Sequence, residues 1–160
     1  MQQNMDSTLE IFNEAKKTPI KDWNFLYGKF QEIKNKILGR KFSLSVSILN
    51  PKNAQKVNRK IRNKNYTPNT LSFKYSKTSG EIVLCPEIIA KEEYSLPHPS
   101  PLLSKEREIV HKMSKFENKI TYLFIHSCIH LLDLDHGPKM DKLEVKFLNY
   151  FLSLPRRGLR

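Results

Sequence analysis

The first long pattern of apolar and polar positions in the chain is helical. From Asp22 to about Leu38, apolar side chains recur at steps of three or four residues, with one adjacent pair; they are Trp23, Leu26, Tyr27, Phe30, Ile33 and Ile37. Asp22 is a favourable residue type before the first turn of a helix, and Gly39 is favourable just after the last turn. We therefore predict a helix over about 22–38 whose apolar stripe faces the core.

A strand and a second helix follow. Between Phe42 and Leu49, apolar residues alternate strictly with serines, the period of two that is typical of a half-buried strand. Asn50 and Pro51 then have the residue types of an N-cap and a first helical position. We predict a helix from this point, with core-facing side chains at Ala54, Val57 and Ile61.

Two more strands are predicted over 70–75 and 81–85, joined by a turn at Ser79-Gly80. Pro68 places a loop over 65–69, before the first of these strands. A short helix is expected over 86–90. The proline-rich segment 96–101 favours an exposed loop, which makes His98 a surface residue.

The last third of the chain has a helical pattern again from about Ser104, with a break near 113–118 and a solvated His111. Residues 120–132 are apolar on nearly every side, which predicts a central buried helix. A final amphipathic helix is predicted over about 139–153. Apolar residues near 9–15 favour a helical extension over about 1–20 or a tail, and 155–160 form a basic tail.

These patterns predict one α+β domain over residues 1–160, a length that suffices for one good core. No apolar run approaches the roughly 20 residues that a membrane span needs, and the polar N-terminus lacks a signal-peptide pattern. Cys85 and Cys128 are too few for a disulfide framework. We therefore expect free thiols and a soluble, cytoplasmic protein without membrane contact.

The charge balance is strongly basic. The chain has 28 Lys+Arg and 16 Asp+Glu, a net charge of +12. Between Pro51 and Gly80 there is no acidic residue, and the second predicted helix carries cations at Lys52, Lys56, Arg59, Lys60, Arg62 and Lys64. Uncompensated cations repel one another, which favours a polyanionic partner such as nucleic acid. The alternative is a generally lysine-rich composition on solvated positions.

Three of the five histidines are close together in the sequence, at His126, His130 and His136. A helix presents the first two on one face because they are four residues apart. Gly137-Pro138 stops the helical pattern, so the third histidine can return after the chain has left the helix. Three imidazoles in this arrangement predict a divalent metal site, zinc above other ions, with one coordination position open. The alternative is a hydrogen-bonded histidine cluster without metal.

The residues between these histidines refine the prediction. Cys128 would point away from the histidine face and is expected to be a small buried side chain. Asp133 and Asp135 are candidates to orient an imidazole, and Asp133 is alternatively a turn former. Metzincin peptidases share the histidine spacing but have Glu directly after the first histidine. Ser127 stands there, which disfavours peptide hydrolysis.

At this stretch the chain resembles the YbeY family of bacterial rRNA maturation factors, whose signature is His-Gly-x-Leu-His-Leu-x-Gly-Tyr-Asp-His. The segment here is His126-Ser127-Cys128-Ile129-His130-Leu131-Leu132-Asp133-Leu134-Asp135-His136, followed by matching Met140 and Glu144. Two family glycines and a tyrosine are replaced, at Ser127, Asp133 and Leu134. A second family signature matches in spacing at Asn58, Arg62, Asn69, Leu71, Ser72, Phe73, Gly80, Glu81 and Ile82.

The resemblance implies a single α+β domain with a small, mostly parallel sheet that has one antiparallel strand and is packed by helices. It implies one metal ion, usually zinc, held by His126, His130 and His136, and a contact of Arg62 with RNA phosphate. It also implies a role in 16S rRNA 3′-end maturation and ribosome quality control. The expected partners are an rRNA precursor and the small ribosomal subunit or its assembly factors.

The resulting hypothesis is a metal-dependent endoribonuclease that acts on single-stranded RNA. Its catalytic residues would be Arg62 and the three histidines, and its RNA contacts would be Lys56, Arg59, Lys60 and Arg62. An alternative is a non-catalytic ribosome- or RNA-binding assembly factor with a structural metal. A metal-dependent peptidase is the third and least favoured function.

Overall fold

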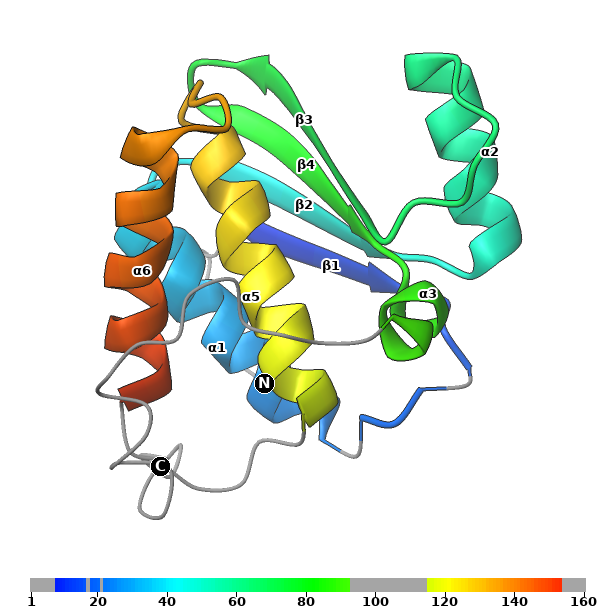
Figure 1. Cartoon of the computed structure of the whole chain (residues 1–160), viewed down its shortest axis with the longest axis horizontal. Coiled ribbons are helices and arrows are strands. Elements are labelled where there is room, and N and C mark those ends of the chain that lie inside the picture. The colour runs from blue at the N-terminus through cyan, green and yellow to red at the C-terminus, as the bar shows by residue number, and fades with distance from the viewer. Residues whose placement is uncertain (1–7, 17, 21, 93–114, 154–160) are drawn as a thin grey trace.

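The computed structural model describes residues 8–16, 18–20, 22–92 and 115–153. In these ranges the chain forms four strands and five helices (Figure 1). The strands are β1 (Leu9–Asn13), β2 (Ser43–Ile48), β3 (Thr70–Ser76) and β4 (Ser79–Leu84). The helices are α1 (Trp23–Ile37), α2 (Pro51–Arg62), α3 (Pro86–Lys91), α5 (Lys115–His130) and α6 (Pro138–Ser153).

The strands form one mixed sheet in the order β1-β2-β4-β3. β2 pairs in parallel with both β1 and β4, whereas β3 pairs antiparallel with β4. β3 is therefore an edge strand. The predicted α+β domain with a small mixed sheet is confirmed.

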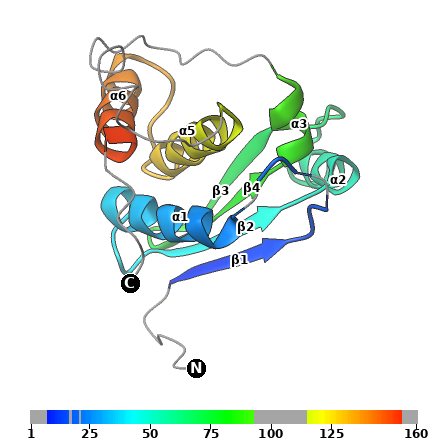
Figure 2. The same cartoon turned by 90° about the horizontal axis from the view of Figure 1, so that it is seen from below.

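Helices α1, α5 and α6 cover one face of the sheet, as Figures 1 and 2 show from two directions. The main core lies between them and the sheet. It contains Val46 and Ile82 from neighbouring strands, Phe30 from α1 and Phe124 from α5, all at most 1% exposed. The Phe30 and Phe124 rings stack with centroids 4.0 Å apart. α5 is thus the buried central helix that the sequence predicts.

Helix α2 packs on the opposite face of the sheet. Successive strand residues point to opposite faces, and Val83 lies in a second, smaller core cluster with Leu71, Cys85 and Ala54 of α2. Val57 packs against this cluster, as predicted. The prediction for Ile61 is wrong, because its side chain is 52% exposed. The polar Asn58 is fully buried instead.

Three of the predicted helix ends are confirmed. The Asp22 carboxylate accepts the backbone N–H of Phe25 at 3.0 Å, and Gly39 has φ +91°, a conformation that glycine adopts without strain. The Asn50 side chain accepts the N–H of Asn53 at 2.9 Å, with Pro51 at the first helical position.

The expected N-terminal helix is wrong where the structure describes it, because 9–13 is strand β1. Leu9 and Ile11 pack against the core, whereas Phe12 on the other face is 60% exposed. The pairing Ile11 with Val46 of β2 makes these residues part of the sheet. Alternation was present in the sequence, but the adjacent pair Ile11-Phe12 obscured it.

Several sequence predictions lie outside the described residues: the loop with His98, the helix from Ser104 with His111, and the tail 155–160. Within the described ranges, no helix is both long and apolar enough to cross a membrane.

Candidate metal centre

The three histidines converge at the C-terminal end of α5. His126 and His130 lie one turn apart on that helix, and His136 follows the turn that connects α5 to α6. One ring nitrogen of each can be chosen so that all three lie within 4.8 Å of one another. The ring centroids are 4.6, 4.8 and 5.3 Å apart. The structure therefore brings together the three residues that the sequence singles out.

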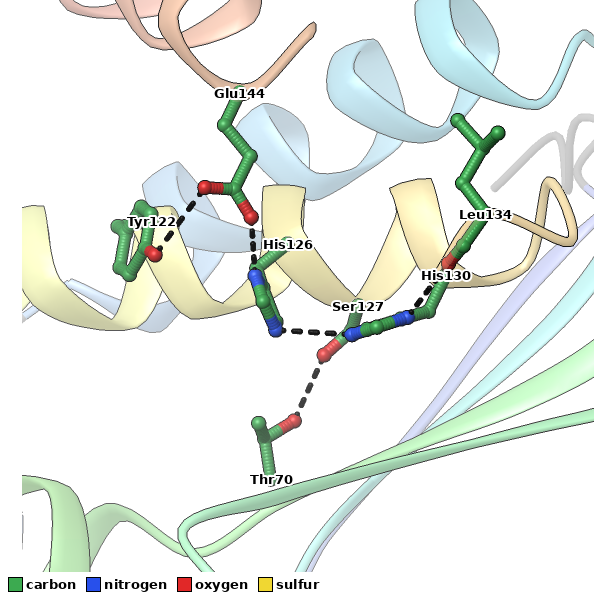
Figure 3. A network of polar contacts seen from close by, with 7 residues as sticks. All are labelled: Thr70, Tyr122, His126, Ser127, His130, Leu134 and Glu144. Carbon is green, nitrogen blue, oxygen red and sulfur yellow. Dashed lines mark hydrogen bonds and ion pairs between the residues drawn. The ribbon is translucent and has the colours of Figure 1, made fainter. Parts of the chain in front are cut away.

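Hydrogen bonds at Nδ1 orient two of the rings (Figure 3). His126 Nδ1 contacts the Oε1 atom of Glu144, and His130 Nδ1 lies 3.1 Å from the backbone oxygen of Leu134. A carboxylate and a carbonyl only accept hydrogen bonds, so each Nδ1 carries the proton and donates it. In a neutral imidazole the other nitrogen, Nε2, then has only a lone pair.

The two Nε2 atoms face each other at 3.1 Å. Two lone pairs at this distance repel unless a proton or a cation lies between them. Two nitrogen ligands of one tetrahedral zinc ion, each about 2.0–2.1 Å from the metal, are about 3.3–3.4 Å apart. The spacing of His126 and His130, with His136 beside them, therefore fits a shared divalent ion.

The environment keeps His130 in the form that binds metals. Burial lowers its pKa, and the neighbouring His126 lowers it further, against the opposing effect of the Leu134 carbonyl. A lower pKa favours the neutral ring, whose Nε2 lone pair is available to a cation.

A buried carboxylate supports His126 from α6. Glu144 is only 4% exposed, and its second oxygen, Oε2, lies 3.5 Å from the hydroxyl of Tyr122. Burial and the Glu144 carboxylate raise the pKa of Tyr122 to about 12, so the phenol stays protonated and donates. Glu144 matches the family continuation in sequence, but its contact with His126 was not predicted, because it depends on how α6 packs on α5.

The turn that carries the third histidine bends at Asp133, which has φ +61°. Aspartate adopts this left-handed conformation more readily than most residues, and the prediction of a turn former is confirmed. The Asp133 carboxylate pairs with Lys74 of β3, not with an imidazole. Asp135 is exposed, and the Nδ1 partners of His126 and His130 are Glu144 and Leu134 instead.

Ser127 points toward the sheet. Its hydroxyl lies 2.9 Å from that of Thr70 on β3, and the residue is 1% exposed. Position 127 therefore supplies no carboxylate to the centre, which removes the general base of the metzincin arrangement. Cys128 lies in the main core at 0% exposure, and burial raises the pKa of its thiol.

The proposed RNA contacts lie on α2. Lys56, Arg59, Lys60 and Arg62 are all exposed, as the charge pattern predicts. However, α2 and α5 pack on opposite faces of the sheet. No contact between Arg62 and the histidines is found among the described residues, so the catalytic role of Arg62 stays a prediction.

Fold and site define a class: a small α+β domain that presents three metal-competent histidines from one buried helix and the turn after it. The family model described as Endoribonuclease YbeY matches residues 3–150. The chain belongs to this family.

Two relatives carry the same name, Endoribonuclease YbeY. The one from Bdellovibrio bacteriovorus is 33% identical over 95 residues, which cover 58% of this chain and 53% of the relative. The one from Pelagibacter ubique is 31% identical over 116 residues, which cover 68% and 65%. The chain thus spans between half and two thirds of these relatives.

A solution structure of a Thermotoga maritima protein has the same fold. It aligns with a TM-score of 0.53 and 18% identity, over 95% of this chain and 99% of that one.

Proposed function

We propose that the protein is a metal-dependent endoribonuclease that hydrolyses phosphodiester bonds in single-stranded RNA, with one zinc ion held by His126, His130 and His136. The observation that carries the proposal is the pair of facing Nε2 atoms, 3.1 Å apart, whose Nδ1 atoms are both bound elsewhere. The match to the endoribonuclease family supports the choice of substrate.

When bound, the metal would lower the pKa of a coordinated water or polarise a phosphoryl oxygen. The chain's own residues supply orientation. Glu144 and the Leu134 carbonyl hold the first two rings with Nε2 toward the site. The phosphates of the substrate are attracted by the exposed cations of α2, which are Lys56, Arg59, Lys60 and Arg62. We assign to Arg62 the stabilisation of the negative charge that develops on the phosphate during cleavage.

The cellular role that we propose is 3′-end maturation of 16S rRNA and ribosome quality control in the cytoplasm. The partners would be an rRNA precursor and the small ribosomal subunit or its assembly factors. Family membership and the acid-free basic helix α2 support this proposal. A basic surface with no compensating carboxylate suits an RNA-rich particle.

A second candidate is an RNA-binding assembly factor whose metal is structural. It is favoured by one observation: a metal on all three histidines would join the turn at Asp133 to α5, as a cross-link does. Against it, His126 and His130 are only half-buried and His136 is exposed, so the three histidines lie at the surface of the domain. The endoribonuclease predicts that RNA is bound and cleaved, whereas the assembly factor predicts that RNA is bound but not cleaved.

The decisive experiment combines metal analysis with RNA cleavage. His130→Ala and His136→Ala should lose the bound metal and at least 100-fold in cleavage of a defined single-stranded RNA, while still binding it. Each removes one of three ligands that the reaction needs together. Lys139→Ala, an exposed substitution at the start of α6, serves as control. Full cleavage by His130→Ala would exclude the proposal.

A further inference from the structure

The loop after α2 is fastened to the helix by several hydrogen bonds. The chain reverses at Asn63, with φ +54°, and the Asn63 N–H donates to the Arg59 carbonyl at 3.0 Å. The fully buried Asn58 donates its side-chain N–H to the Tyr66 carbonyl at 2.9 Å. The Arg59 Nε–H donates to the Asn65 side chain at 3.1 Å. The backbone at Tyr66 is therefore fixed relative to α2.

The ring carried by this fixed backbone is 55% exposed. An isolated exposed aromatic is common on protein surfaces. Tyr66, however, follows directly the residue that Arg59 binds, and it lies in the acid-free segment between Pro51 and Gly80. A second exposed apolar side chain, Ile61, lies in the last turn of the same helix. Cations and an exposed ring are thus held together on one pre-ordered unit.

We infer that α2 and its loop form a binding site for single-stranded RNA in which Tyr66 stacks on a base while Arg59 and Arg62 contact the flanking phosphates. The inference deepens the proposed function and rests on it for the choice of RNA. Proteins that bind single strands with little sequence preference combine two features: a positively charged surface along the RNA backbone and aromatic rings on which the bases stack. A duplex does not fit, because its bases are already stacked on each other.

Charge and stacking can be separated by the salt dependence of binding. A phosphate contact contributes about −0.7 to the slope of log K against log salt for a single strand, whereas stacking contributes nothing to that slope. Loss of one stacked base costs about 5- to 150-fold in affinity. Tyr66 and Arg62 therefore have different expected signatures.

The test measures binding of a fluorescent single-stranded RNA, and of an abasic oligomer of equal length, to the full metal-loaded chain over a range of salt. Tyr66→Ala should weaken RNA binding about 5- to 150-fold with an unchanged salt slope. It should not change binding of the abasic oligomer, and Tyr66→Phe should bind as the parent does. Arg62→Ala should reduce the slope for both oligomers by about 0.7.

Tyr75→Ala is the matched control, since Tyr75 is a tyrosine of similar exposure, 62%, whose hydroxyl binds the Glu81 carboxylate. It should leave binding unchanged. Equal affinities of Tyr66→Ala and the parent would overturn the inference, as would equal weakening with the abasic oligomer. If the parent and Tyr66→Ala cleave RNA equally well, the inference about Tyr66 is refuted and the proposed endoribonuclease function is not. If binding depends on Tyr66 but no RNA is cleaved, the endoribonuclease function is refuted and the inference about Tyr66 is not.

Discussion

Glu144 is a carboxylate that the fold removes almost completely from water, between the Tyr122 hydroxyl and the His126 ring. Burying a carboxylate is costly unless donors surround it. Its two partners offset that cost, and one of them is a metal-competent histidine. The contact fixes which His126 nitrogen carries the proton, so Glu144 positions the His126 ring at the candidate metal centre.

We expect Glu144→Ala to lower zinc affinity about 10- to 100-fold. Glu144→Gln keeps an oxygen that accepts from Nδ1 and should lose less. Tyr122→Phe, which removes only the 3.5 Å contact, should lose least. Competition with a chromophoric zinc chelator measures all three. Identical zinc affinity in Glu144→Ala, with the fold intact by circular dichroism, would contradict the role.

At the scale of elements, strand β3 supports the histidine-bearing helix and turn. Two of the residues that depart from the family signature contact this strand: Ser127 bonds to Thr70, and Asp133 pairs with Lys74. Because β3 residues alternate, Thr70 and Lys74 lie on the face toward α5. Gly80 of the adjacent strand also lies under α5, where an added Cβ would be 3.1 Å from a Leu131 methyl.

The turn at Asp133 gives a stability prediction. A left-handed backbone costs most non-glycine residues about 1–2 kcal/mol, and aspartate less. Asp133→Ala should therefore lower the free energy of unfolding by about 1 kcal/mol. Asp133→Gly relieves the backbone and loses only an exposed ion pair, worth at most about 1 kcal/mol. It should be at least as stable as the parent.

Urea denaturation of the metal-free protein measures the free energies of unfolding of these variants. Asp133→Asn separates the effect of the backbone conformation from that of the ion pair. Asparagine tolerates the same backbone conformation but has no charge. Glycine and asparagine variants that are as unstable as the alanine variant would show that loss of the ion pair with Lys74, rather than backbone strain, dominates at this turn.

The sequence predicted helices and strands correctly where their patterns are strong and depend on neighbouring residues. The alternation of 42–49, the caps at Asp22 and Asn50, and the buried helix with His126 and His130 all depend on residues near in sequence. Strand β1 was missed because its alternation is short and its burial depends on pairing with β2 and packing against the core, both of which involve residues far away in sequence. The exposure of Ile61 and the contact of Glu144 with His126 depend on which surfaces meet in the folded chain. The spacing of apolar residues along the sequence does not determine this.

At the scale of the whole molecule, the core and the metal centre are separate. The core between the sheet and α1, α5 and α6 is apolar, whereas the histidines lie at one end of α5. Stability and metal binding should therefore be separable to a large extent. A small zinc domain that folds only with its metal would behave differently.

Removal of metal should abolish RNA cleavage but leave the protein folded. Metal at 100 to 1,000 times its dissociation constant stabilises the native state by about 3–4 kcal/mol, which chelation would remove. Circular dichroism and a thermal melt, with and without a strong chelator, measure the effect. Loss of helical signal at 25 °C on chelation would instead support a structural metal.

The position of edge strand β3 has a consequence for product length. β3 begins four residues after Tyr66, and its first residue, Thr70, contacts Ser127, which directly follows His126 on α5. An RNA anchored at the loop and cut at the histidines would have to cross this edge. The protein would then act as a molecular ruler, leaving a constant number of nucleotides between the anchored base and the new end.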